Sequence, residues 1–153
     1  MTRIDFYLLT DTGTRAAIDV TCRLCDKAAA RGKRVYVHSV EADTVDELDA
    51  ALWSFRQGSF IAHERYTGEV DAAAPPAVLL GHLPPPDEYR SVMINLAAET
   101  PAFFSQFERV LEVVSGDARV RAAARKRFRF YRDRGYALEI HELGANGAPD
   151  AQR

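Results

Sequence analysis

Arginines spaced by three or four residues are the part of this sequence best suited to ligand chemistry. The segment from Asp117 to Arg134 holds eight basic residues and two acidic ones, although the whole chain has a formal charge of −2. On a helix advancing about 100° per residue, Phe128 borders a stripe of four guanidinium groups. The stripe consists of Arg121, Arg125, Arg129 and Arg132. Because guanidinium groups recognise carboxylates and phosphates in a planar, bidentate way, we expect an anionic ligand with a hydrophobic part.

Two ligand classes fit this helix. A nucleic acid would place its phosphates on the arginines and stack a base on Phe128. An acidic peptide would use its carboxylates on the arginines and a hydrophobic end on the ring. The short stripe and the acidic remainder of the chain favour the peptide, because a long nucleic acid needs an extended basic path. Direct binding of single-stranded nucleic acid through the same helix stays the alternative.

The other face of this helix is predicted to be core, with Val120, Ala124 and Tyr131 at helical spacing. Arg127 and Arg134 fall near that face. We expect them either to extend towards solvent or to pair with carboxylates.

Nothing in the sequence assembles a catalytic site. Cys22 and Cys25 form a C-x-x-C pair, but they continue an apolar stripe in mid-helix, which favours packing over redox chemistry or metal binding. The first strand-to-helix turn, TDTGT, lacks the glycines of a dinucleotide or nucleotide fingerprint. His38 and His141 lie in predicted strands and are interpreted as structural histidines. We therefore predict a protein that is not an enzyme and needs neither cofactor nor metal.

A second candidate surface involves Trp53 and Phe60. Trp53 turns about 100° away from the inward face of a predicted helix, and Phe60 follows in a Gly-Ser loop. The loop could fold back and bury its own aromatic residues. The alternative is an apolar patch for another protein, since Trp and Phe are enriched at the centres of interfaces.

The elements that must position these residues alternate between strand and helix. Strands are predicted at 3–9, 35–40, 77–83, 91–97, 109–114 and 136–143. Helices are predicted after Gly13, from a Thr44-x-x-Glu47 capping box to Phe55, after Thr100-Pro101 and across the basic segment. Because several strands are almost continuously apolar, we expect an α/β domain with a mainly parallel sheet and helices on both faces.

Length and composition set the broad class. A chain of 153 residues is most simply one domain, here predicted for 1–143, with a small, polar and disordered tail at 144–153. No apolar run approaches the roughly 20 residues of a membrane span. Two cysteines agree with a reducing compartment, so we expect a cytoplasmic protein.

Several segments together resemble the chi subunit of bacterial DNA polymerase III holoenzyme, a component of the clamp-loader complex. They are FYLL near the start, GKRV (32–35), LDAALW (48–53), SFIAH (59–63), INL (94–96), FERVLEVV (107–114) and AARKRFRFYRDRGY (123–136). Their order and spacing carry the resemblance over about residues 3–143. The sequence departs at Phe128, where relatives can have tyrosine, and at Ala62, where relatives have proline.

The resemblance implies a Rossmann-like, non-catalytic replication adaptor found at replication forks on the nucleoid. It implies binding of the acidic, phenylalanine-terminated tail of single-stranded DNA-binding protein, so that contact with nucleic acid is mostly indirect. It also implies binding of the psi subunit that joins chi to the clamp loader, and it leaves open a repair helicase as a further partner. The tail-binding positions implied are Val114, Arg121, Arg125, Phe128 and Arg129. The psi-binding positions implied are Trp53 and Phe60.

Overall fold

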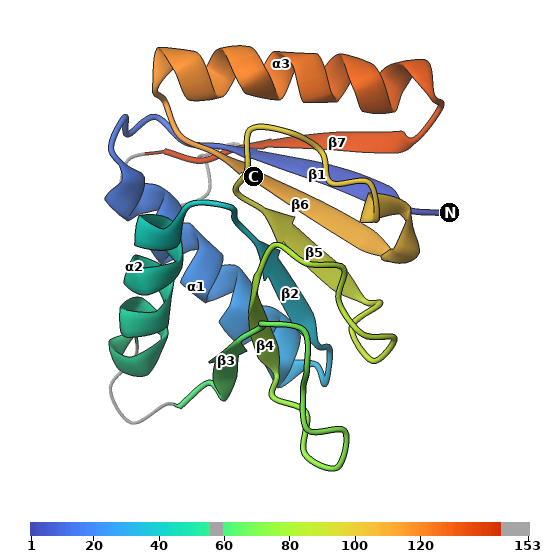
Figure 1. Cartoon of the computed structure of the whole chain (residues 1–153). Helices are drawn as coiled ribbons and strands as arrows, with labels where there is room; N and C mark the ends of the chain where they lie inside the picture. Colours follow the sequence, from blue (N-terminus) through green and yellow to red (C-terminus); the bar gives the residue numbers. More distant parts are fainter. Residues whose placement is uncertain (56–59, 145–153) are drawn as a thin grey trace.

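A seven-stranded sheet in which every strand pair is parallel forms the centre of the computed structural model, which describes residues 1–55 and 60–144. The strand order is β3-β4-β2-β5-β6-β1-β7 (Figure 1). The strands are β1 (Arg3–Leu8), β2 (Val35–His38), β3 (His63–Arg65), β4 (Val78–Gly81), β5 (Val92–Asn95), β6 (Arg109–Val114) and β7 (Ala137–Glu142). The helices are α1 (Thr14–Ala30), α2 (Ala42–Ser54), α3 (Ala118–Asp133) and the 3-10 helix η1 (Phe104–Gln106). The predicted α/β fold is confirmed, in a Rossmann-like arrangement.

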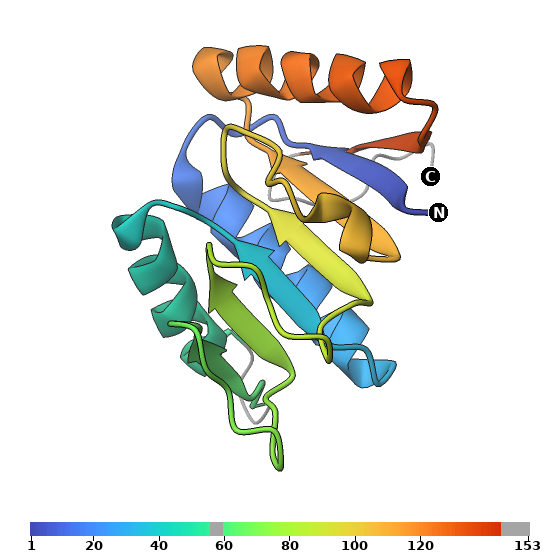
Figure 2. The ribbon, with the colours of Figure 1, turned by 45° about the vertical axis from the view of Figure 1, so that its right-hand side comes forward.

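The helices cover opposite faces of the sheet and so create three layers (Figure 2). On one face, α1 and α2 pack their buried side chains, such as Ile18 and Leu48, in one hydrophobic cluster. On the other face, α3 contributes Ala124 and Tyr131 to a second cluster that includes Phe6. Strands buried on both faces explain the nearly continuous apolar runs of the sequence. Within the described residues, no helix combines the length and apolar character needed to cross a membrane.

The placement of β1 between β6 and β7 determines the neighbourhood of α3. Leu8, at the end of β1, pairs in register with Val114 of β6 and with Glu142 of β7. The chain leaves β6 through α3 on one face, whereas it leaves β1 through α1 on the other. The carboxyl ends of these strands therefore meet beside the basic helix.

The helix expected after Thr100-Pro101 is not observed. This segment forms only the 3-10 helix η1, because its phenylalanines serve as anchors on the sheet: Phe104 and Phe107 are buried in the cluster under α3. The Thr100 hydroxyl donates a hydrogen bond to the Tyr131 hydroxyl (3.4 Å), which ties the segment to α3. Aromatic burial at this spacing outweighs helix propensity.

Two further differences concern the region of α2. The helix begins at Ala42, so Thr44 lies inside it rather than at its cap, and the observed N-cap residue, Glu41, makes no side-chain capping bond. The edge strand β3 was not predicted from the sequence. Its three residues, His63–Arg65, show no apolar alternation, because two of the three side chains are exposed.

The two cysteines are packing residues. Cys22 and Cys25 are fully buried on α1 and form no disulfide. Burial raises the pKa of the Cys22 thiol to about 12 and that of Cys25 still further. Neither thiol can supply a thiolate near neutral pH, which agrees with the interpretation of the pair as core. Apart from Gly144, the predicted tail of residues 144–153 lies outside the described residues.

Candidate functional site

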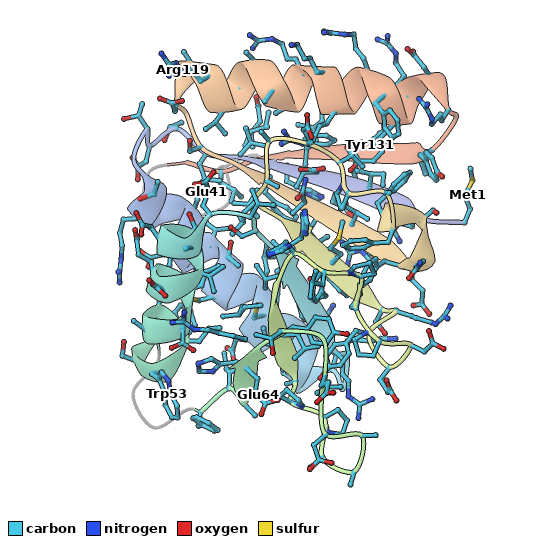
Figure 3. All side chains as sticks on the ribbon, in the orientation of Figure 1. Met1, Glu41, Trp53, Glu64, Arg119 and Tyr131 are labelled. Carbon is cyan, nitrogen blue, oxygen red and sulfur yellow. The ribbon has the colours of Figure 1, made fainter. Side chains whose placement is uncertain are left out.

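Helix α3 carries the candidate site, and the sequence defines both of its ends. Asp117 is the N-cap, and its carboxylate accepts hydrogen bonds from the backbone N–H groups of Arg119 and Val120, each at 3.1 Å. At the other end Gly135 has φ = +81°. This is the left-handed backbone conformation that commonly ends an α-helix and that glycine adopts most easily. Between these ends, nitrogen-tipped side chains rise from the outer face of α3 (Figure 3).

A buried ion pair fixes the rotation of α3 on the sheet. Arg127 donates from Nε to Glu112 Oε1 at 3.0 Å, and Tyr131 donates its hydroxyl to Glu112 Oε2 at 2.7 Å. Arg127 also donates from Nη1 to the carbonyl of Ala98 at 2.8 Å. Burial raises the pKa of Glu112, and the Arg127 guanidinium opposes that rise. Arg127 therefore pairs with a carboxylate, one of its two predicted fates, and the opposite side of the helix faces solvent.

A groove runs along one flank of α3, with a cavity volume of about 410 Å³. We call it the α3–β7 groove. Its apolar lining consists of Phe6, Leu8, Ala124, Phe128 and Ile140, contributed by β1, α3 and β7. Its cationic lining consists of Arg121, Arg125, Arg129 and Arg132. The stripe predicted from the sequence therefore borders a real cavity with an apolar interior.

Among the arginines that line this groove, Arg125 and Arg129 remain available for a ligand. Both are exposed, and within residues 1–55 and 60–144 neither forms a hydrogen bond or an ion pair through its side chain. Phe128 is half-buried beside them, in edge-to-face contact with Phe6 at a centroid distance of 5.5 Å. Arg132 is exposed and pairs with its neighbour Asp133 at 3.2 Å. Charge and ring are thus side by side.

Arg121 is largely occupied by the protein itself. Its Nε donates to the carbonyl of Ser115 at 3.0 Å, and its Nη2 donates to the carbonyl of Leu9 at 2.5 Å. These bonds tie α3 to the carboxyl ends of β6 and β1. Arg121 lines the groove, but its first role in this structure is to hold the groove's walls together.

Val114 differs from the other predicted tail-binding positions. It is fully buried at the end of β6, within the cluster that α3 covers, and it does not line the groove. In this conformation Val114 offers no surface to a ligand. It can support the site only by packing.

The crevice where α/β sheets often bind nucleotides is filled by the chain. That crevice lies between β1 and β6, where the connections leave on opposite faces. The backbone N–H of Gly116 donates to the Asp11 carbonyl at 2.7 Å, and a Cβ at Gly116 would meet the Thr10 carbonyl oxygen at 2.3 Å. The Arg121 guanidinium donates hydrogen bonds to the adjacent carbonyls of Ser115 and Leu9. The loops that follow β1 and β6 are therefore in close backbone contact at this point.

Trp53 and Phe60 form an exposed cluster near the opposite edge of the sheet from β7. Their exposed fractions are 61% and 62%, and their ring centroids lie 5.1 Å apart. His63 completes the cluster, with its ring 5.2 Å from that of Trp53. We call these three residues the aromatic patch. Figure 3 shows Trp53 at the end of α2, far from Arg119 on α3. Both side chains are exposed, so the interpretation that these aromatic residues are buried is wrong for Trp53 and Phe60.

The family model described as "DNA polymerase III chi subunit, HolC" matches residues 1–139. The chain belongs to this chi family. Its members are components of DNA replication.

Curated chi relatives match along almost their entire length. The chain is 45% identical to DNA polymerase III subunit chi of Pseudomonas aeruginosa, covering 94% of this chain and 98% of that protein. It is 27% identical to the subunit of Escherichia coli (90% and 96% covered) and 26% identical to that of Haemophilus influenzae (91% and 96% covered). Among solved structures, T4 UvsW matches with a TM-score of 0.65 at 7% identity, over 94% of this chain and 42% of that one. This last likeness concerns the fold alone.

The chi-family chain also contains a polar cluster that the sequence did not reveal. Asp5 is buried, with Arg109 Nη2 at 2.8 Å from one oxygen and His141 Nε2 at 2.9 Å from the other. Burial would raise the pKa of Asp5, but hydrogen bonds from His141 and Arg109 outweigh it and lower the pKa. The ligand atoms of Asp5, Glu139 and His141 lie close enough together to hold a metal ion. Because the carboxylate is already neutralised by Arg109, the cluster is better described as structural.

The two histidines that were predicted to lie in strands, His38 and His141, differ from each other. His141 is hydrogen-bonded, as predicted for a structural histidine. His38 is buried, and its Nδ1 has no hydrogen-bond partner among the described residues, which the sequence did not predict. Burial, with a smaller contribution from His82, lowers the pKa of His38 to about 4. His38 is therefore neutral at physiological pH, which limits the cost of burying it.

Proposed function

We propose that this chi-family chain is a non-catalytic replication adaptor that binds the acidic C-terminal tail of single-stranded DNA-binding protein in the α3–β7 groove. The observation that carries the proposal is the pair Arg125 and Arg129, exposed beside an apolar cavity and without acidic partners among the described residues. Acidic tail residues and the terminal carboxylate pair with these guanidinium groups. The terminal phenylalanine enters the cavity against Phe128, Leu8 and Ile140.

The strength of this contact follows from its exposure. A hydrogen bond to a charged group contributes about 1.5–3 kcal/mol before ordering costs. A short peptide held by a few such bonds and one aromatic contact should bind at about micromolar affinity. A partner with several tails would bind more tightly, because the second tail binds at a high effective concentration. Such an adaptor works in the cytoplasm, at the replication fork.

The aromatic patch supports a second contact in the same proposal. Two large aromatic side chains exposed next to each other are unusual outside binding sites, and Trp is the residue most enriched among binding hot spots. We assign this patch to the psi subunit, which would connect the chain to the clamp loader. A repair helicase is a competing occupant of the same patch. The two surfaces lie at opposite edges of the sheet, so both partners can bind at once.

Calorimetric titration of a tail peptide tests the first contact. The peptide, four acidic residues followed by a terminal phenylalanine, should bind the wild-type chain at about micromolar affinity and Arg125→Ala at least tenfold more weakly. Lys27→Ala, on α1, is the matched control because it removes one positive charge from the other face of the sheet. Equal binding by wild type and Arg125→Ala would remove the site, and binding by neither would remove the function. An oligonucleotide that binds the purified chain without any tail would support the nucleic-acid alternative.

Copurification tests the second contact. Trp53→Ala should lose psi while keeping the tail peptide, and Arg125→Ala should do the opposite. If Trp53→Ala retains psi, the aromatic patch is not its binding site.

A further inference from the structure

A second groove lies along the other flank of α3. Its cavity volume is about 610 Å³. We call it the α3–Thr100 groove after the segment that forms its outer wall. Its lining residues include Glu99, Thr100, Arg119, Ala122, Lys126 and Phe130. Helix α3 therefore has a cavity on each side, and both are edged by cations.

The ridge between the two grooves is low near the start of α3. Ala122 is exposed and lines the α3–Thr100 groove. At about 100° per residue, it lies on the wheel between Arg129 on one flank and Lys126 on the other. Ala118 also falls on the outer side of the helix and is exposed. A chain could cross α3 at Ala122 with guanidinium and ammonium groups on both sides and no large side chain in its way.

The cations of the second groove are available. Arg119 and Lys126 are exposed, and within the part of the chain that the structure describes their side chains make no ion pair. Glu99 is the acidic residue among the groove's lining residues, and it too is exposed. The edge of the groove thus favours a negatively charged occupant.

The aromatic ring in this groove is already covered, which distinguishes between anionic ligands. The Arg134 guanidinium carbon lies 3.8 Å from the centroid of Phe130, and Phe104 meets the same ring edge-to-face at 5.7 Å. Single-stranded nucleic acid gains much of its binding energy by stacking bases on open rings. Phe130 is not open in this way, so an acidic peptide fits the groove better than a nucleic acid.

We propose that the tail peptide crosses α3 at Ala122 and that the α3–Thr100 groove binds the acidic segment preceding the residues held in the α3–β7 groove. This inference rests on the function proposed above. Passing over a helix about 10–12 Å wide takes about three to four extended residues at about 3.3 Å each. The bound peptide is accordingly about ten residues long, and its upstream half binds through charge, with Arg119 and Lys126 as its contacts.

Three peptides separate this inference from the proposed function. The short one has four acidic residues and a terminal phenylalanine. The long one adds five upstream residues, three of them acidic, and a third peptide replaces those five by Gly and Ser. By anisotropy, the long peptide should bind wild type about three- to tenfold more tightly than the other two, as expected for two exposed ion pairs.

Variants of the chain then show which residues give the long peptide its higher affinity. In Arg119→Ala/Lys126→Ala the long peptide should fall to the affinity of the short one, whose own binding should change less than about twofold. Ala122→Glu, on the solvent face of the helix, should act in the same way by repelling the crossing chain. Lys27→Ala/Lys33→Ala removes two charges elsewhere and should preserve the advantage.

Each other outcome overturns the inference. An advantage that persists in Arg119→Ala/Lys126→Ala, or that is lost equally in the remote control, would mean that the groove makes no specific contact. If wild type binds neither peptide, the proposed function fails and the inference with it. If an oligonucleotide, rather than the long peptide, depends on Arg119 and Lys126, the groove is a nucleic-acid site.

Discussion

Arg127 and Arg125 lie two residues apart on α3, yet their surroundings are opposite. Arg127 is 5% exposed and donates to Glu112 and to the Ala98 carbonyl. Arg125 is exposed at the edge of the α3–β7 groove and has no partner among the described residues. The same side chain therefore orients the helix on one face and remains available to a ligand on the other.

The difference follows from what each position faces. Arg127 meets β6, where Glu112 is the charged residue in an otherwise apolar inner stretch of strand, and each ion compensates the other's burial. Arg125 faces water, where its charge needs no internal partner. An exposed cation with no partner contributes little to folding, so a row of such residues points to binding rather than to stability.

The largest effect should come from breaking the buried pair. Arg127→Ala leaves the Glu112 carboxylate buried without its cation, so the free energy of unfolding should fall by about 3–5 kcal/mol in urea titrations. Arg125→Ala should change it by less than about 0.5 kcal/mol. Combining Arg127→Met with Glu112→Leu should recover only part of the loss, because the Tyr131 hydroxyl and the Asn95 amide then lose their acceptor. A loss below about 1 kcal/mol for Arg127→Ala would mean that the pair does not anchor α3.

An exposed arginine should show the reverse behaviour. Arg129→Ala should weaken the tail peptide by about 10- to 100-fold, because a charge-assisted contact contributes about 1.5–3 kcal/mol. The unfolding midpoint should stay unchanged, as measured by circular dichroism on the same samples. A destabilised Arg129→Ala protein would contradict the separation of the two faces.

Arg121 should fall between these extremes. Its guanidinium satisfies the carbonyls of Ser115 and Leu9 while lining the groove. Arg121→Ala should therefore lower the free energy of unfolding by about 1–3 kcal/mol and weaken the peptide several-fold. Unfolding and titration curves for this variant check both effects. A change in affinity alone would make Arg121 a ligand residue in the same sense as Arg125.

The smallest effect concerns salt. Raising the salt from about 0.1 M to about 1 M shortens the screening length from about 10 Å to about 3 Å, so the peptide should bind several-fold more weakly. The destabilisation caused by Arg127→Ala should hardly change between the same two conditions, because the Arg127–Glu112 pair is shielded from ions. Titrations and unfolding curves at both concentrations provide the comparison. If salt changed the peptide affinity and the destabilisation caused by Arg127→Ala to the same extent, the proposed difference in burial between the groove arginines and Arg127 would be contradicted.

The sequence predicted much of this arrangement because periodicity is local. A helical wheel suffices to group Arg121, Arg125 and Arg129 with Phe128, since their relative positions depend only on helix geometry. A strand of Val and Leu likewise predicts burial on both faces. A signal was also available for Arg127: Glu112, a single acid within RVLEVV, had to find a cation once that segment became a buried strand.

Other features depended on contacts between distant segments. Phe6, Leu8 and Ile140 line the groove only because β7 pairs with β1 while α3 covers both, and no local pattern encodes that pairing. The hydrogen bond from Arg121 to the Leu9 carbonyl spans 112 positions in the sequence. The segment after Thr100 had the cap of a helix, but its phenylalanines gained more by packing on the sheet.

Amide-resolved NMR during titration with the tail peptide tests the central claim most directly. Shifts should concentrate at Arg125, Phe128, Arg129 and Ile140, and the signals of Trp53 and His63 should not move. A peptide that binds while shifting the aromatic patch, or that leaves α3 and β7 unperturbed, would contradict the assignment of the groove.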